Sequence, residues 1–194
     1  MKYILIFFII FSNLLFDSCS GNIFWSSKAK LKWSDFKSNK CGEHIALTAS
    51  GIKYITQSEN DTLVILQVNA IFDKNKSAKT ANKSELNDFC LRHEQTHFDI
   101  SEWYARVFRK ALTDSIITSR VEIPKLYHVI CKEFNEMQER YDSATNHGIN
   151  RIEQYKWNDY VTKQLSNYSS YSNTKVAVRI KRRTGMGIRN KTGD

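Results

Sequence analysis

The sequence has little of three features that often decide a protein's class. Its four cysteines, at positions 19, 41, 90 and 131 of 194, include no CxxC pair, so a structural zinc knuckle is not predicted. No internal repeat is visible, and Pro124 is the single proline. The longest apolar run, residues 4–16, is shorter than the about 20 residues that span a bilayer comfortably.

The first 19 residues are typical of an export signal. Lys2 gives a short positive start, and the apolar run ends in Phe16-Asp17-Ser18-Cys19. Cys19 after a small residue resembles the cleavage box of a bacterial lipoprotein, in which the cysteine is lipidated, and cleavage there without lipid is the alternative. We therefore expect an exported protein that is secreted or lies in the periplasm or cell envelope. In the lipoprotein case the lipidated Cys19 attaches it to a membrane.

The positive charge lies mainly at the C-terminus. The net charge is +9, and residues 175–194 carry seven basic residues against Asp194 alone. The rest of the chain is only mildly basic. Because this stretch lacks regularly interleaved aromatic residues, and an export signal precedes it, nucleic-acid binding is not expected. We expect residues 169–194 to form a flexible basic tail that is solvated or touches acidic lipid or cell-wall polymer.

The hydrophobic pattern predicts strands first and helices afterwards. Residues 44–57 and 63–72 are rich in strand-forming residues, and the polar turn between them predicts an antiparallel hairpin. From Asn82 onward, apolar residues recur at spacings of three and four. This period predicts three helices, at about residues 82–111, 124–143 and 149–165. Asn82 with Glu85 predicts a capping box at the start of the first.

The residues that point to chemistry are His93-Glu94-Gln95-Thr96-His97, an HExxH pattern. Positions four apart lie one turn apart on one helix face, so the two imidazoles can hold one Zn²⁺. Both histidines lie on the apolar stripe, where polar rings without partners are costly and a shared metal satisfies both. A pair of core histidines with ordinary hydrogen bonds is the alternative. Glu94 flanks the metal as the general base that takes a proton from activated water.

A catalytic zinc usually takes a third protein ligand. The extended pattern with another histidine six residues after His97 is absent, because Trp103 stands there. We rank His147 first as the third ligand, then Asp142, and then Glu102, which points well off the face of the histidines. His147 has an alternative role as a cap at the end of its helix.

The residues around this pattern resemble a bacterial family of predicted secreted zinc-dependent proteases, domain of unknown function 922. The closest likeness is in residues 91–100 with Glu102, Ala105 and Arg106. It extends over about residues 30–165 through Trp33, Asp35, Phe36, Thr48, Ser50, Gly51, Ile52, Tyr54, Ala70, Phe72, Asp73, Tyr141, Asp142, Thr145, His147, Gly148, Gln154 and Trp157. Two positions depart from the family pattern: Ala144 stands where Glu is frequent, and Ala78 where Trp is common.

The resemblance implies an α+β, zincin-like metallohydrolase domain over residues 22–168. A small N-terminal antiparallel sheet would pack on a helical part with a long HExxH helix. The implied function is that of an exported zinc-dependent peptidase acting on a peptide or protein. A non-catalytic zinc-binding module of the cell envelope is the alternative, and Ala144 favours it. In such enzymes a strand beside the HExxH helix lines the cleft, and residues 63–72 are our candidate. No oligomeric state is predicted.

Overall fold

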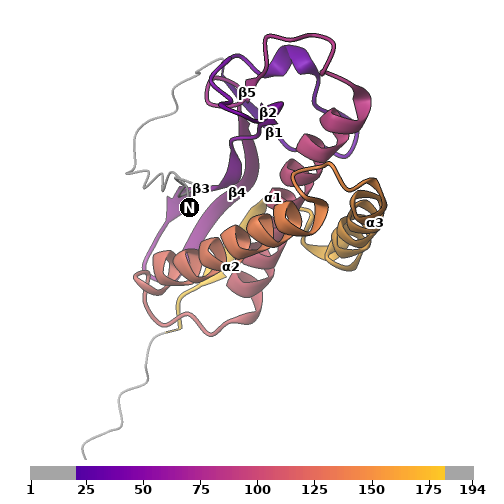
Figure 1. The fold of residues 1–194 in the computed structure, drawn as a ribbon. Coiled ribbons are helices and arrows are strands. Elements are labelled where there is room, and N and C mark those ends of the chain that lie inside the picture. Colours follow the sequence, from indigo (N-terminus) through magenta and orange to yellow (C-terminus); the bar gives the residue numbers. More distant parts are fainter. Residues whose placement is uncertain (1–20, 182–194) are drawn as a thin grey trace, which may run out of the picture.

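The computed structural model describes residues 21–181. The expected export signal with Cys19, and the end of the tail at 182–194, lie outside the described residues. The described chain is a mixed α+β domain in which the helix α1 (Asp88–Asp114) lies between an antiparallel sheet and two further helices (Figure 1). This confirms the predicted α+β class. No helix among residues 21–181 combines the length and apolarity needed to cross a membrane.

The main sheet is built around β4 (Leu63–Asp73). Along one side β4 pairs with β3 (Ser50–Glu59), which confirms the predicted hairpin. Along the other side it pairs with two short strands, β1 (Asn22–Phe24) and β6 (Lys175–Arg179). A second, two-stranded sheet joins β2 (Ala46–Leu47) to β5 (Ala78–Lys79). All named pairings are antiparallel.

The alternation of buried and partly exposed side chains along β4 explains why the sheet packs on α1. Every second side chain is buried, namely Val64, Leu66, Val68, Ala70 and Phe72. Because successive side chains of a strand point to opposite faces, these five form one apolar face. Phe72 meets Phe98 of α1 with ring centroids 5.8 Å apart. The buried face of the sheet thus fixes the helix that carries the HExxH pattern.

The three predicted helices are present, with different starting points. The first, α1, begins after Asn87, whose side chain accepts a hydrogen bond from the amide of Cys90 at 2.9 Å. The expected start at Asn82 is wrong, because Asn82 and Glu85 bond to each other within a turn before the helix. The second helix, α2, spans Glu122–Thr145, and the third, α3, spans Arg151–Asn167. Two short 3-10 helices, η1 (Trp33–Asp35) and η2 (Ser169–Tyr171), complete the elements.

The C-terminal segment corrects the expectation of a flexible tail from residue 169. Residues 169–171 form η2, and residues 175–179 form β6 against β4. In β6 the small apolar residues Val176 and Val178 are buried while Lys175 and Arg179 are exposed. Two of the charged residues that suggested a solvated tail, Lys175 and Arg179, therefore lie on the outer face of a strand. Its pairing partner is more than 100 residues away in sequence.

A buried ion-pair cluster joins α1 to the main sheet and to the segment before β6. Arg109 is 1% exposed and donates to both carboxylate oxygens of Glu102, at 3.0 and 3.2 Å. It also donates to the carbonyl of Val68 in β4 at 2.9 Å and to that of Tyr171 in η2 at 2.9 Å. Arg106 donates to the same carboxylate of Glu102 at 2.9 Å. A single guanidinium has enough donors to join the helix to the sheet and to the segment before β6.

We expect Arg109→Met to lower the free energy of unfolding by about 3–5 kcal/mol, because breaking a buried pair leaves a buried carboxylate short of its partner. Urea denaturation followed by circular dichroism measures this change. Lys110→Met is the control, since the neighbouring Lys110 pairs with Asp114 at the surface. Equal, small changes in the two variants would contradict the role given to Arg109.

Candidate metal centre

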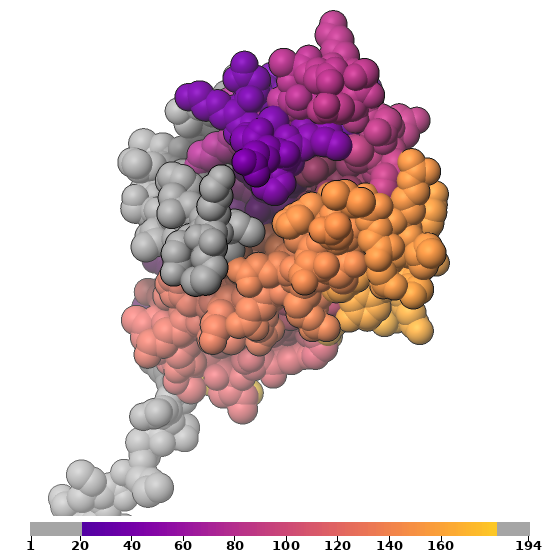
Figure 2. All heavy atoms as spheres, viewed as in Figure 1, coloured from indigo at the N-terminus to yellow at the C-terminus, as the bar shows by residue number. Residues whose placement is uncertain are grey.

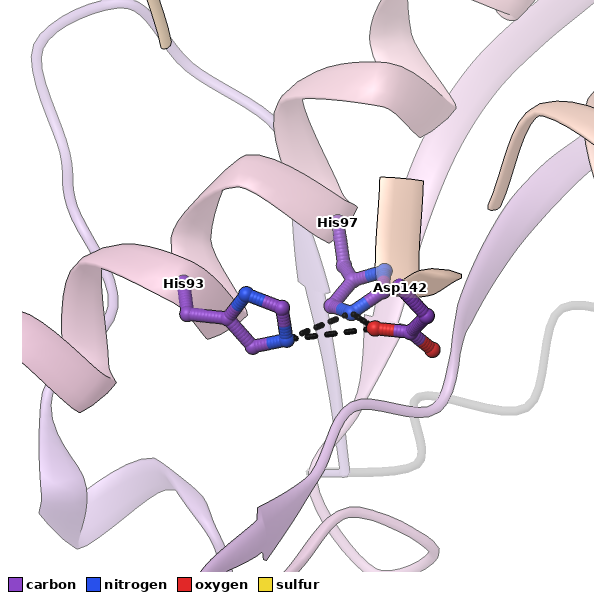
Figure 3. Close-up of side chains that lie close together, drawn as sticks. All are labelled: His93, His97 and Asp142. Atoms are coloured by element: carbon purple, nitrogen blue, oxygen red, sulfur yellow. Dashed lines mark hydrogen bonds and ion pairs between the residues drawn. The ribbon is translucent and has the colours of Figure 1, made fainter. Parts of the chain in front are cut away.

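Three side chains from two helices converge at one point (Figure 3). His93 and His97 lie one turn apart on α1, and Asp142 comes from the last turn of α2. The Nε2 atoms of the histidines are 3.2 Å apart. Oδ1 of Asp142 lies 3.2 Å from Nε2 of His93 and 3.0 Å from Nε2 of His97. These residues form a group whose potential ligand atoms all lie within 4.8 Å of one another.

The spacing of these atoms suits a small cation. Nitrogen and oxygen ligands bind zinc at about 2.0–2.2 Å, so two ligands of a tetrahedral site lie about 3.3 Å apart. The three observed separations, 3.0 to 3.2 Å, are close to that value. The triangle formed by His93, His97 and Asp142 therefore has the size to hold one such ion.

Two glutamine side chains fix which nitrogen of each histidine faces the triangle. Nδ1 of His93 lies 2.9 Å from Oε1 of Gln154, and Nδ1 of His97 lies 2.7 Å from Oε1 of Gln138. The amide nitrogen of Gln154 donates to Asn158, and that of Gln138 donates to the His97 carbonyl at 3.0 Å. Each amide oxygen is thus left to accept, so Nδ1 carries the proton. Both Nε2 lone pairs then point at Asp142.

This arrangement leaves an acceptor without a donor. With both histidines neutral, Oδ1 of Asp142 is buried and has no hydrogen-bond donor among the described residues. It faces two further acceptors, the Nε2 atoms of His93 and His97. Buried polar atoms are nearly always satisfied, and three converging acceptors can be satisfied together only by a positive charge. The site therefore has the chemistry of a cation-binding centre.

The electrostatics of the cluster also favour positive charge. Burial by itself lowers the pKa of His97, but the hydrogen bond and charge of the Asp142 carboxylate raise that pKa to about 9. Burial opposes ionisation of Asp142, yet His93 and His97 hold its pKa well below the usual range. A proton on His97 can thus supply the charge in place of a metal, and the two compete for the same position.

Tyr141 forms the floor of the centre. Its fully buried ring stacks on His93, with centroids 4.8 Å apart and planes at 21°, and meets His97 edge-on at 4.8 Å. Its hydroxyl donates to the His93 carbonyl at 3.3 Å and accepts from the Gln154 amide. Burial raises the pKa of Tyr141 far above its ordinary value, so the hydroxyl stays neutral. Tyr141 holds the two imidazoles in place.

Glu94 lies beside the centre with its carboxylate uncommitted. It is 6% exposed, and its side chain makes no hydrogen bond or ion pair within residues 21–181. Its negative charge contributes to the raised pKa values of His97 and Tyr141, which places it near both rings. A buried carboxylate without a fixed partner is available to exchange protons.

Only one of the three candidate third ligands joins the histidines. Asp142 does so, whereas the carboxylate of Glu102 is taken by Arg106 and Arg109. Nδ1 of His147 lies 3.8 Å from Oδ1 of Asp142, outside the triangle. The structure thus groups Asp142 with the two histidines, and not His147, the residue ranked first from the sequence. The reason is local: α2 ends at Thr145, and the backbone then turns and carries His147 off the helix face.

The turn after α2 packs directly against a histidine of the centre. Asn146, His147 and Gly148 have φ angles of 48°, 52° and 79°, three left-handed residues in succession. A Cβ placed on Gly148 would lie 2.9 Å from Cγ of His93. Glycine is therefore required at this position by the backbone and by the imidazole beside it.

Two residues that bind the histidines were assigned no role from the sequence. Gln154 belongs to the residues of the family resemblance, but its role there was open. Gln138 lies four residues before Asp142 on α2. Because that spacing places both on one helix face, pairing a His-x₃-His face with a Gln-x₃-Asp face is the signal that could have found Gln138.

The sequence model of a family described as a bacterial protein of unknown function, DUF922, matches residues 18–148. The match includes His93, Glu94, His97 and Asp142 and ends at the turn with Gly148. Nothing matches among curated proteins or among solved structures.

We expect Gly148→Ala to destabilise the protein by about 1–3 kcal/mol through backbone strain and contact with His93. Gly42→Ala is the matched control, because Gly42 also has a positive φ, +62°, but a Cβ added there would have nothing within 4 Å of it. Urea denaturation and the imidazole NMR signals of His93 measure the two effects. Equal destabilisation with an undisturbed His93 signal in both variants would contradict the close packing.

Proposed function

Because the chain belongs to the bacterial DUF922 family, whose function is unknown, we propose its activity from the site itself. We propose that the protein is an exported zinc-dependent hydrolase of zincin type, and specifically a peptidase. The observation that carries this proposal is the buried Oδ1 of Asp142, which has no donor among the described residues and faces the Nε2 atoms of His93 and His97.

The donor set favours zinc with a catalytic role. Two imidazole nitrogens and one carboxylate oxygen are common zinc ligands, and hard cations such as Mg²⁺ and Ca²⁺ prefer oxygen alone. Three protein ligands leave a fourth position for water or substrate, as in catalytic rather than structural sites. Bound at His93, His97 and Asp142, zinc would supply Lewis-acid chemistry, lowering the pKa of water and polarising a carbonyl.

Glu94 would move the proton. Its carboxylate accepts a proton from the attacking water as the water oxygen bonds to the carbonyl carbon. It then donates that proton to the amide nitrogen as the carbon–nitrogen bond breaks, so that a carboxylic acid and an amine are formed, and the acid's proton passes to the amine to give carboxylate and ammonium. Gln138, Gln154 and Tyr141 would keep the imidazoles oriented throughout. The protein ends the cycle in its starting protonation state.

The sheet supports an extended peptide as substrate, although not through the strand expected. β4 pairs on both of its sides, so it cannot line a cleft as an edge. Among the described residues β3 pairs with β4 alone and is the open edge. The Ser50 hydroxyl at its start lies 2.8 Å from that of Ser101, one turn after His97 on α1. An unpaired edge that starts beside the centre fits a peptide backbone by strand addition.

The register shows which groups of β3 face the open edge. Trp25 donates to the carbonyl of Ala70, and Val68 donates to that of Thr174, so both β4 residues direct their backbone groups away from β3. Their partners in β3, Ile52 and Tyr54, must then direct theirs to the open side. The Ile52 carbonyl accepts a hydrogen bond from the Tyr127 hydroxyl at 2.7 Å. The amide of Ile52 and both backbone groups of Tyr54 face the edge available to a peptide.

We expect Asp142→Ala to lose zinc and His147→Gly to keep it. Changes beside a metal site cost about 10- to 100-fold in affinity, and loss of a ligand should cost more. Glycine at position 147 also suits its positive φ. Mass spectrometry of zinc in purified wild-type and variant proteins, with competitive chelator titration, measures the difference. Loss of zinc from His147→Gly with retention in Asp142→Ala would reverse the assignment.

We expect Glu94→Gln to lower peptide hydrolysis by at least about 10²–10⁴-fold while zinc stays bound, because the amide cannot accept the proton. Hydrolysis of fluorescein-labelled casein and of a quenched fluorescent peptide library measures activity, and metal analysis of the same samples is the control. The alternative, a non-catalytic zinc-binding envelope module, predicts bound zinc without turnover in the wild type. Activity that survives in Glu94→Gln would contradict the mechanism.

A further inference from the structure

His147 occupies a costly backbone conformation beside the centre. It has a φ of 52° and follows Asn146, with a φ of 48°. A histidine in the left-handed region costs about 1–3 kcal/mol and persists only when its surroundings impose it. Strain of this kind concentrates at functional sites, so the strained turn suggests that His147 has a functional role.

Hydrogen bonds impose the conformation. The amide of His147 donates to the Asp142 carbonyl at 2.9 Å, and the amide of Asn150 donates to the Thr145 carbonyl at 2.8 Å. The hydroxyl of the buried Thr145 accepts from the Gly148 amide at 3.3 Å and donates to the Tyr141 carbonyl at 2.8 Å. The turn is therefore tied to the same helical turn that carries Asp142 and Tyr141. The position of His147 relative to the centre is fixed.

The His147 ring lies on the solvent side of the centre. Exposure of the side chains rises from 6% for His93 and 12% for His97 to 32% for Asp142 and 42% for His147. Nδ1 of His147 is 3.8 Å from Oδ1 of Asp142, so an ion bound by that oxygen lies at most about 6 Å from Nδ1. The oxygen of a carbonyl bound to the ion at its open position would lie between the ion and Nδ1 of His147.

A second histidine packs on this ring. His44, which precedes β2, lies with its ring centroid 5.4 Å from that of His147. In Figure 2 the indigo atoms, from the first part of the described chain, meet the orange atoms of the region after α2 on one face of the molecule. Contact with His44 narrows the orientations open to the His147 side chain. The side chain of His147 makes no hydrogen bond to the carbonyls at the end of α2 within residues 21–181, so a capping role does not explain the position of His147.

We propose that His147 is a catalytic residue that donates a hydrogen bond to the oxygen of the scissile carbonyl as negative charge develops on it. Either neutral form of imidazole carries one N–H, so the donor is present without an added proton. Preorganised donors of this kind strengthen their bond in the transition state. The inference rests on the proposed zinc hydrolase and adds to it the group that stabilises the oxyanion.

Binding of acetohydroxamate, a small anion that occupies the open position of zinc sites, tests this without turnover. Titration calorimetry on the zinc-loaded full chain compares wild type with His147→Gly, which removes the donor and suits the positive φ, and His147→Gln, which keeps a donor. His128→Ala, at an exposed site on α2, is the control. We expect the Kd to rise about tenfold in His147→Gly, to recover at least partly in His147→Gln and to stay unchanged in the control.

On peptide substrates, His147→Gly should lower kcat by about 10²–10³-fold with little change in KM, as loss of one oxyanion donor does. An unchanged Kd and kcat in a zinc-loaded His147→Gly protein overturns the role of His147 and leaves the proposed hydrolase intact. Loss of zinc from that variant also overturns it, by making His147 a ligand. A wild type that binds neither zinc nor acetohydroxamate overturns the proposed function itself.

Discussion

Three acceptor atoms brought together without a donor among the described residues are the constraint on which the rest of the structure depends. Nε2 of His93, Nε2 of His97 and Oδ1 of Asp142 lie 3.0 to 3.2 Å apart in a buried position. With the protons held on Nδ1 by two glutamines, these lone pairs repel one another unless a cation lies between them. The neighbouring residues make sense as the means of holding this arrangement.

The fold holds the three acceptor atoms in place from two directions. On one side, Arg109 joins α1 to the sheet and to the C-terminal segment through Glu102, Val68 and Tyr171. On the other, Gln138 and Tyr141 bind α2 to the histidines, so that Asp142 reaches the centre in register with them. The side chains of Glu94 and His147 make no hydrogen bond among residues 21–181, and they flank the position where chemistry would occur.

Local sequence patterns predicted the hairpin and the three helices. The features that were not predicted depend on contacts between residues far apart in the sequence. The alternation in β4 and the helical period through His93 and His97 are contained in a few neighbouring residues, so both were predictable. The strand β6 was not, because its burial depends on β4 more than 100 residues earlier. The sequence ranked His147 above Asp142 as the third member of the site, but the positive φ angles after Thr145 carry His147 away from the two histidines and leave Asp142 beside them.

X-ray absorption spectroscopy at the zinc edge of the purified protein tests the central claim most directly. The account predicts one bound zinc with nitrogen and oxygen ligands at about 2.0–2.2 Å and the multiple-scattering signal of two imidazoles. A third imidazole would place His147 among the ligands, and a sulfur ligand at about 2.3 Å would bring in one of the free cysteines. Either result, or a protein that binds no zinc, would contradict a centre built from His93, His97 and Asp142.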